Sequence, residues 1–462
     1  MIRMIRSPLA RPRLARLARA GLISTVLAAA ATGLSALPAR PAAAAQHTRN
    51  TQTTLRVWYA SDDPTESPLA QALGRSFQQT HPGVTVLVSP YGLDDMNAKL
   101  QLALGSGNPP DLIYTTPRGP GLPIYLHDGK LLDLTAIARK DGWAGSLRPG
   151  LLAQYNDSIT RTGNAGGHVF AAPYVLAAVG LLYNQTILTK LHVAVPRSLP
   201  QLEQDLATIK RAGLTPLGFG NADGWVGDDW YLTLVNSLTN PATLQPEQHL
   251  DPHFRFSGPA FTQAGQLLQQ WAQAGYFTSQ FAGLDAQDSV EAFFGGHTAL
   301  QLVSSTQNGQ IVADAAQTHT PIGIAAFPGS GGTPVMPQSG YEGWAIPAQG
   351  RQPALAEEFI TQMLSAQTAQ TLLAYGLLPA RSNASASGAQ AFQRAYLQAL
   401  ASATPGVYLD GAPVPNLNAT MEANVELLLQ RLATPGVLTR NLQLVYDSDG
   451  VRATSTRTDG EF

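Results

Sequence analysis

The stretch FGNADGWVGDDW combines an aromatic ring with carboxylates, a set of groups that can hold a small polar molecule. Trp225 offers a flat apolar face for stacking, and Asp223 and Asp228 offer acceptors for hydrogen bonds. Glycine and asparagine keep the stretch irregular. The alternative is that Trp225 fills a space between helices. Trp230, at the start of the helical stretch WYLTLVNSL, is expected in the core.

A second stretch of this kind, GYEGW, contains Tyr341, Glu342 and Trp344. Its glycines, Gly340 and Gly343, let the backbone come close to a neighbouring group. We expect this stretch to lie where the chain crosses between two parts of the fold. The alternative for Trp344 is that it opens a buried strand.

Motifs of the common enzyme classes are absent from the sequence, which contains no Walker loop, no dinucleotide glycine fingerprint, no HExxH and no GxSxG. His249 and His253 are four positions apart, but Asp251 and Pro252 interrupt any helix that would align them. We therefore expect no metal site, no cofactor and no catalytic residue.

The rival class is a secreted hydrolase acting on glycans. Such an enzyme needs two carboxylates that face each other across the bond to be cleaved. Glu357 and Glu358 are neighbours on a predicted helix, where adjacent side chains point apart, so this pair indicates solvent exposure. The many other acidic residues leave the alternative open.

Residues 1–45 have the features of a signal peptide. Arginines without any acid precede the apolar run GLISTVLAAAATGLSALPA, and Ala43 and Ala45 form an Ala-x-Ala cleavage site before Gln46. The alternative is an uncleaved anchor at residues 21–39. No two arginines are adjacent, which favours the general secretory route. The chain has no cysteine, so it is not a lipoprotein, and we expect it in the periplasm or outside the cell.

Charge and length narrow the remaining classes. Without residues 1–45 the chain has 22 basic and 31 acidic residues, a formal charge of −9, which argues against binding to nucleic acid or to anionic membranes. The rest of this 462-residue chain is longer than single cores usually grow, so two domains are expected.

The first part of the mature chain alternates strands and helices. Residues 55–60, 84–88 and 111–114 predict strands, and helices are expected from Ser67 onward and over 93–105. Strand, helix, strand, helix, strand is the pattern of a parallel sheet with right-handed crossovers. In such sheets the loops beyond the carboxyl ends of the strands build the ligand crevice.

A similar pattern starts again near Tyr174. VGLLYN, TALQLV and IGIAAF predict strands, and Ser198 with Gln201 forms a capping box for a helix. Trp271 shares an apolar helix face and is expected in the core. The polar composition of residues 447–462 predicts a flexible tail.

In their order, these segments resemble those of the extracellular solute-binding proteins of ABC transporters, in the carbohydrate-binding family that includes maltose-binding protein. The resemblance is carried by LRVWYA, FQQTHPGVTV, NAKLQLALGSGNPPDLIY, GKLLDLT, HVFAAPYVLAAVGLLYN, VPRSLPQLEQDLATIKRAGLTPLGF, FFGGHTALQLVSS, GYEGWAIPA and AEEFITQMLSAQTAQTLLAYGLLPARS. Each segment alone is weakly specific, but the nine together span almost the whole mature chain.

The resemblance implies an α/β, two-lobed periplasmic-binding-protein fold of type II, with a ligand cleft between the lobes and a hinge of several strands. Lobe 1 would comprise residues 51–171 and 335–387, and lobe 2 residues 172–334 and 388–446. The implied function is that of a monomeric, non-enzymatic subunit of an ABC importer, which closes on a sugar or oligosaccharide and delivers it to a membrane permease. A sensor subunit that presents its ligand to a receptor is an alternative.

The resemblance also points to site residues. Carbohydrate sites combine aromatic faces with paired hydrogen-bonding groups, and the loop after the first strand contacts ligand in this family. That loop contributes Tyr59, Asp62 and Asp63, although the alternative for the two aspartates is a turn before the helix. Trp58 lies inside the strand and is expected to be buried.

After the third strand, Thr115 and Arg118 stand in line with the ligand-contacting region of the family. Arg118 offers a fork for a pair of hydroxyls or a carboxylate, and the alternative is a surface arginine. Tyr174 is the candidate at the hinge. The chain reads SST where maltose-type relatives carry a tryptophan, so Ser305 is the candidate there and a maltodextrin ligand is disfavoured. Polyamines and glycerol phosphates are alternative ligands.

Overall fold

The computed structural model describes most of the chain after the predicted signal peptide. The described residues are 52–60, 66–117, 122–155, 167–248, 251, 253–329, 331–408, 414 and 416–455. The signal peptide, its predicted cleavage site and three candidate site residues, Asp62, Asp63 and Arg118, lie outside them.

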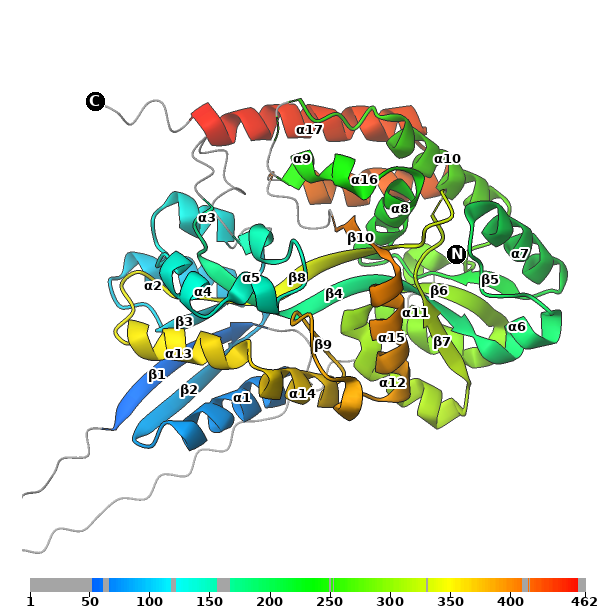
Figure 1. Ribbon diagram of the computed structural model, residues 1–462. Helices are drawn as coiled ribbons and strands as arrows, with labels where there is room; N and C mark the ends of the chain where they lie inside the picture. Colours follow the sequence, from blue (N-terminus) through cyan, green and yellow to red (C-terminus); the bar gives the residue numbers. More distant parts are fainter. Residues whose placement is uncertain are drawn as a thin grey trace, which may run out of the picture. The chain divides into compact units, whose positions relative to one another are not determined.

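One mixed sheet runs through the described part of the chain (Figure 1). Its main path has the order β2-β1-β3-β8-β4-β6-β5, while β7 and β9 pair with β4, and β10 pairs with β8. The strands are β1 (Thr53–Ala60), β2 (Val84–Tyr91), β3 (Leu112–Thr115), β4 (Ala171–Asn184), β5 (Thr215–Gly218), β6 (Thr298–Ser304), β7 (Ile322–Ala325), β8 (Val335–Ala345), β9 (Leu378–Pro379) and β10 (Thr404–Val407).

Helices build two hydrophobic cores on this sheet. The first core packs mainly against α1 (Glu66–Thr80), α2 (Leu93–Gly105), α3 (Leu122–His127), α4 (Thr135–Lys140), α5 (Trp143–Ser146), α12 (Asn308–Thr318), α13 (Pro353–Met363), α14 (Ala366–Ala374) and α15 (Ala391–Ser402). The second packs mainly against α6 (Gln185–Leu191), α7 (Leu199–Arg211), α8 (Trp225–Leu238), α10 (Pro259–Gln273), α16 (Leu417–Leu429) and α17 (Pro435–Ser455). Three further short elements are the helices α9 (Gln245–Gln248) and α11 (Ala286–Ala292) and the 3-10 turn η1 (Leu152–Tyr155).

The two cores share β4 and β8, the longest strands of the sheet. β4 pairs with β8 and β9 through residues 171–178, and with β6 and β7 through residues 179–184. The first 12 of its 14 residues are all buried. A strand covered on both faces needs such a continuous apolar run, which explains the sequence AAPYVLAAVGLL.

Local signals in the sequence explain where several helices begin. Ser198 caps α7, because its Oγ accepts from the backbone N of Gln201 at 3.3 Å. The side chain of Gln201 accepts from the backbone N of Arg197 at 3.0 Å, so the predicted capping box is displaced by one residue. Trp230 and Trp271 are buried in the second core, as predicted.

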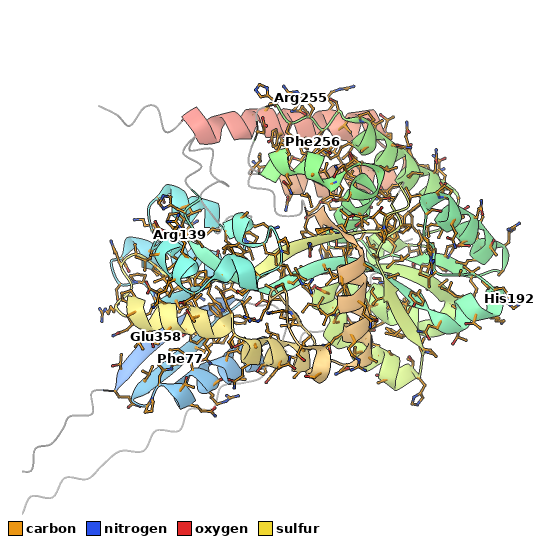
Figure 2. The ribbon with its side chains drawn as sticks, viewed as in Figure 1. Phe77, Arg139, His192, Arg255, Phe256 and Glu358 are labelled. Carbon is orange, nitrogen blue, oxygen red and sulfur yellow. The ribbon has the colours of Figure 1, made fainter. Side chains whose placement is uncertain are left out.

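The first core is closed on one flank by α1 and α13. Phe77 of α1 lies 5.2 Å from Phe359 between ring centroids, and His81 Nε2 lies 2.9 Å from Oε2 of Glu358. Figure 2 labels Phe77 and Glu358 on this flank. The sequence HPG ends α1 here and turns the chain into β2.

Three sequence predictions of local structure need correction. Helix α8 begins at Trp225 rather than near Trp230. Asn221 Oδ1 accepts from the backbone N of Gly227 at 2.6 Å, and this bond gives a first-turn N–H the acceptor that the helix itself cannot supply. The apolar face of residues 355–364 predicts one helix that continues to Gly376, but the structure has two helices here, because Ser365 caps α14 through a 3.1 Å bond from Thr368 N.

The third correction concerns the predicted tail. Residues 447–455 continue α17, which ends at Ser455. Tyr446 is buried in the second core, and Gln443 Nε2 donates to Asp447 Oδ1 at 2.8 Å. Because elongating an existing helix adds one hydrogen bond for each residue fixed, residues 447–455 remain helical although most of them are polar.

An acidic side chain anchors the segment that enters β4. Asp133 Oδ1 accepts from the backbone N and the hydroxyl of Thr135, and its Oδ2 lies 2.6 Å from His168 Nδ1. Burial alone would raise the pKa of Asp133, but the hydrogen bonds from Thr135 and the contact with His168 outweigh it and lower the pKa.

We expect Asp133→Asn to make stability less sensitive to acid. A carboxyl whose pKa is lowered by folding stabilises the native state above its unfolded pKa of about 3.9, and that contribution disappears as the pH falls through the lower, native pKa. The wild type should therefore be more stable than Asp133→Asn at neutral pH, and the two should converge below about pH 4. Denaturant titrations at several pH values measure this difference. A constant difference down to low pH would contradict the prediction.

Candidate functional site

A buried carboxylate with three aromatic rings lies on the strands that the two cores share. Glu342 of β8 is fully buried, and its Oε2 accepts hydrogen bonds from the hydroxyls of Tyr59 and Tyr174, the first at 3.3 Å. The rings of Tyr174 and Trp344 stack, with centroids 5.5 Å apart and an interplanar angle of 29°. Three strands, β1, β4 and β8, therefore contribute to one cluster, which we call the Glu342 cluster: Tyr59, Tyr174, Glu342 and Trp344.

Irregular strand pairing directs these side chains. Pro173 pairs with Gly343 and Val175 with Glu342, so the register passes over Tyr174; it then passes over Tyr341, because Leu176 pairs with Gly340. Each strand thus contains one extra residue at the same place. Such bulges turn side chains away from the regular alternation and are frequent at functional sites.

The charge of Glu342 acts on a neighbouring tyrosine. Tyr155 of η1 is fully buried, and its pKa is raised well above the ordinary value by burial and then by the negative charges of Glu342 and Tyr341. Tyr155 therefore keeps its proton and is a permanent donor beside the cluster. Tyr155 was not among the candidates, because AQYND contains no periodicity or motif that distinguishes it.

Two further candidates adjoin the cluster through the sheet. Thr115 ends β3 opposite Gly343, is buried, and donates its hydroxyl to the carbonyl oxygen of Thr116 at 3.2 Å. Tyr341 is half-buried on β8. Tyr114 of β3, which was not among the candidates, packs edge-on against Tyr59 at 5.5 Å.

The remaining described candidates lie outside the Glu342 cluster. Trp225 and Asp228 lie in the first turn of α8, where Trp225 is half-buried against the second core and Asp228 is buried. Asp223 Oδ2 accepts from the backbone N of Ala286 at 3.1 Å, which ties this loop to α11. Ser305 is also buried, and its hydroxyl accepts from Ala178 N and donates to Leu176 O, both at 3.0 Å.

The structure thus brings Tyr59, Tyr174, Glu342 and Trp344 into contact and places Thr115 and Tyr341 beside them. It places Trp225 and Asp228 on α8 of the second core, and Ser305 in the 3-10 turn that follows β6. Ser305 secures the backbone of β4 in this state. Ligand contacts of all these residues remain predictions.

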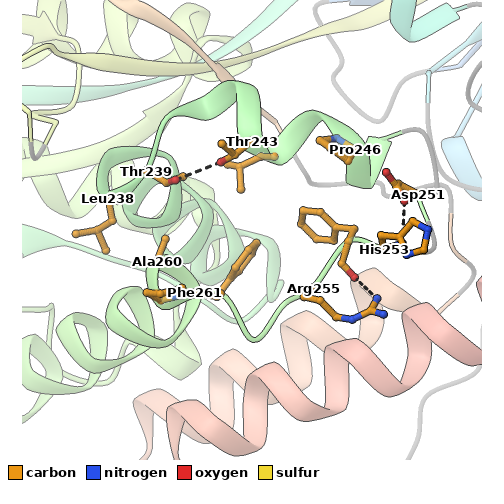
Figure 3. Close-up of a pocket in the computed structure, with 13 residues that line it drawn as sticks. Leu238, Thr239, Thr243, Pro246, Asp251, His253, Arg255, Ala260 and Phe261 are labelled. Carbon is orange, nitrogen blue, oxygen red and sulfur yellow. Dashed lines mark hydrogen bonds between the residues drawn. The ribbon is translucent and has the colours of Figure 1, made fainter.

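A separate pocket lies beside the second core, away from the Glu342 cluster. Its volume is about 460 Å³, and it is bounded by the end of α8, by α9 and by the start of α10 (Figure 3). Leu238, Phe254 and Phe261 supply apolar walls, and His253 and Arg255 lie at its rim. No sequence candidate lines it.

The described residues contain no helix long and apolar enough to cross a membrane. In the same part of the chain, no three histidine, aspartate or glutamate side chains come together in a way that could hold a metal ion.

Comparison with known proteins identifies the class of protein that this fold defines. The family of bacterial extracellular solute-binding proteins matches residues 60–370, so the chain belongs to that family. Over 281 residues it is 25% identical to the melibiose/raffinose/stachyose-binding protein MelE of Bacillus subtilis (strain 168). That alignment covers 60% of this chain and 61% of MelE, so the chain spans less than two thirds of this relative.

Solved structures share the fold at low sequence identity. A chitin oligosaccharide binding protein superposes with a TM-score of 0.72 at 19% identity, covering 87% of this chain and 99% of the other. RafE in complex with raffinose superposes with a TM-score of 0.66 at 18% identity, covering 86% and 99%. The apo form of RafE from Streptococcus pneumoniae gives 0.68 at 18% identity, covering 86% and 98%. The predicted fold class, an α/β two-lobed solute-binding-protein fold, is confirmed.

Proposed function

We propose that the chain is the extracytoplasmic solute-binding subunit of an ABC importer, which binds a sugar or oligosaccharide and delivers it unaltered to a membrane permease. The observation that carries the proposal is the position of the Glu342 cluster. Stacked aromatic rings and a carboxylate are the groups that recognise sugar faces and hydroxyls, and here they lie on β4 and β8, the strands common to both cores.

The relatives support a sugar as the ligand. MelE is a melibiose/raffinose/stachyose-binding protein, and RafE is solved with raffinose. We infer that the present chain takes a ligand of the same class, with Tyr59, Tyr174, Tyr341, Glu342 and Trp344 on one side. All of these except the half-buried Tyr341 are buried, so the proposal requires that they become exposed when the lobes open. Trp225 would contribute from the second core.

Ligand capture would follow from lobe closure. We propose lobes of residues 51–171 with 335–387, and of 172–334 with 388–446, connected by β4 and β8. Helices α12 and α15 belong to the second of these lobes but pack against the first core. A ligand that contacts both lobes stabilises the closed state by its differential affinity for that state. We further infer a monomer that is secreted by way of the signal peptide at residues 1–45 and has no enzymatic activity.

A thermal-shift screen of the mature protein tests the proposal. Melibiose, raffinose, stachyose and chitin oligosaccharides should be compared with spermidine and glycerol 3-phosphate. A ligand at 100 times its dissociation constant adds about 2.7 kcal/mol to stability, so a true ligand should raise the melting temperature clearly, and we expect this for a sugar.

The recovered ligand distinguishes the alternatives. Chromatography of each stabilising sugar after long incubation should return it intact. A cleaved product would favour the glycan-active hydrolase, and stabilisation by spermidine or glycerol 3-phosphate alone would overturn the choice of a sugar.

A further inference from the structure

One edge of β8 has a gap. Along its other edge β8 pairs with β4 from Gln338 to Ala345. On the edge with the gap, β10 pairs with residues 335–338 and β3 with residues 343–345. Within the described ranges, no strand pairs with residues 339–342 on this edge.

Two side chains of η1 occupy this gap. Gln154 Oε1 accepts from the backbone N of Gly340 at 2.9 Å and from the hydroxyl of Ser339 at 3.2 Å. The hydroxyl of Tyr155 donates to the carbonyl oxygen of Gly340 at 2.6 Å. Together they satisfy both backbone groups of Gly340, as a neighbouring strand would.

Glycine is required for the Tyr155 ring to lie against β8. A Cβ at Gly343 would lie 2.6 Å from the Tyr155 ring, and a Cβ at Gly340 would lie 2.7 Å from Pro173 Cβ and 3.1 Å from the ring. The 2.6 and 2.7 Å distances are too short for a real Cβ, and 3.1 Å is tight. The two glycines of GYEGW therefore make room for the Tyr155 ring and for Pro173.

The gap coincides with the bulged part of the β4–β8 pair. Residues 339–342 include Tyr341 and Glu342, and the register with β4 is irregular here. The carbonyl oxygen of Tyr155 also accepts from Phe170 N at 3.1 Å, just before β4 begins. η1 therefore contacts both strands that the two cores share.

We propose that Gln154 and Tyr155 are positioning residues, which occupy the gap in β8, fix the course of this strand between the two cores and thereby hold Tyr341 and Glu342 in place for the ligand. The part that concerns the ligand rests on the proposed function. The part that concerns the course of β8 can be tested without any ligand.

The ligand-free test combines distance measurement with hydrogen exchange. The chain has no cysteine, so spin labels can be attached through Gln101→Cys in α2 and Arg440→Cys in α17, both exposed. In the double variant Gln154→Leu/Tyr155→Phe, we expect a broader label-to-label distance distribution. Exchange of the Gly340 amide should be at least about tenfold faster, a change of about 1.4 kcal/mol, while residues 335–338 stay protected by β10.

Two matched variants serve as controls. Tyr125→Phe removes the hydroxyl of another buried tyrosine of the first core, which has no hydrogen-bond partner in the described structure, and should change neither readout. Gln154→Glu keeps an acceptor for Gly340 N and should keep its exchange slow. If the double variant has the distance distribution and the Gly340 exchange of the wild type, the inference is overturned.

The ligand arm uses a sugar that stabilises the wild type. We expect the double variant to bind it about tenfold more weakly by calorimetry, with Tyr125→Phe unchanged. Equal affinity in the wild type and the double variant would overturn the positioning role. If the wild type binds no sugar of the screen, the proposed function fails, and the ligand-free measurements alone decide the course of β8.

Discussion

Asp111→Ala is expected to lower the free energy of unfolding by about 3–5 kcal/mol, the loss typical of breaking a buried charge pair. The Asp111 carboxylate is 1% exposed. It accepts from the backbone N of Arg56 at 2.8 Å and of Arg351 at 2.9 Å, and from Nε and Nη2 of Arg56 at 3.2 and 3.3 Å. Alanine would remove the acceptor from all four donors. Urea denaturation followed by circular dichroism measures the loss.

Asp95→Ala is the matched control. Asp95 pairs with Lys99 one helical turn away at 3.3 Å, but both side chains are largely exposed, and such pairs contribute no more than about 0.5 kcal/mol. If Asp111→Ala lowers the free energy of unfolding as little as Asp95→Ala does, then Asp111 does not join β1 to the start of β3 and to the loop before α13.

Trp225→Ala is expected to abolish the rise in melting temperature caused by a sugar ligand. The ring is half-buried at the start of α8, so part of it can stack on a sugar face from the second core. Alanine removes that surface and leaves the rest of α8 in place. The ligand-free protein should lose only about 1 kcal/mol, as an ordinary substitution does. Differential scanning fluorimetry with and without the sugar gives both numbers.

Trp271→Ala separates binding from packing. Trp271 is 2% exposed in the second core, so its truncation should cost about 3–5 kcal/mol. The folded fraction of this variant should still bind the sugar. A ligand-free Trp225→Ala protein that melts like Trp271→Ala would place Trp225 in the core and remove it from the site.

The fold was largely predictable because its elements carry local signals. The pattern of residues 55–60 and 84–88 predicts β1 and β2, and LDDMNAKLQLALG is α2 from its first residue to its last. The structure differs from the predicted elements where a side chain accepts a hydrogen bond from a backbone N–H and so starts a helix. Asn221 advances the start of α8, and Ser365 separates α13 from α14. Trp58 is half-buried instead of buried, packing against Tyr91 at 5.1 Å near the edge of the sheet.

The residue types of the candidate site were predictable, but the contacts between their side chains were not. Tyr59, Tyr174 and Glu342 are far apart in sequence, and only strand register brings their side chains together. Periodicity cannot reveal the bulge in β4, because this strand is buried on both faces and its sequence has no alternation that an inserted residue would shift. The sequence does not indicate the role of Gln154 and Tyr155 either, because that role depends on a gap in the strand pairing of β8.

The neighbours of β3 set the order in which this molecule can be completed. β3 pairs with β1 on one edge, which precedes it, and with β8 on the other, which is synthesised only after α12. Stable folding of the amino-terminal half must therefore wait for late segments of the polypeptide, and such distant pairings form slowly. Export in an unfolded state, which the signal peptide predicted at residues 1–45 would imply, would benefit from this delay, because the polypeptide would stay unfolded until translocation is finished.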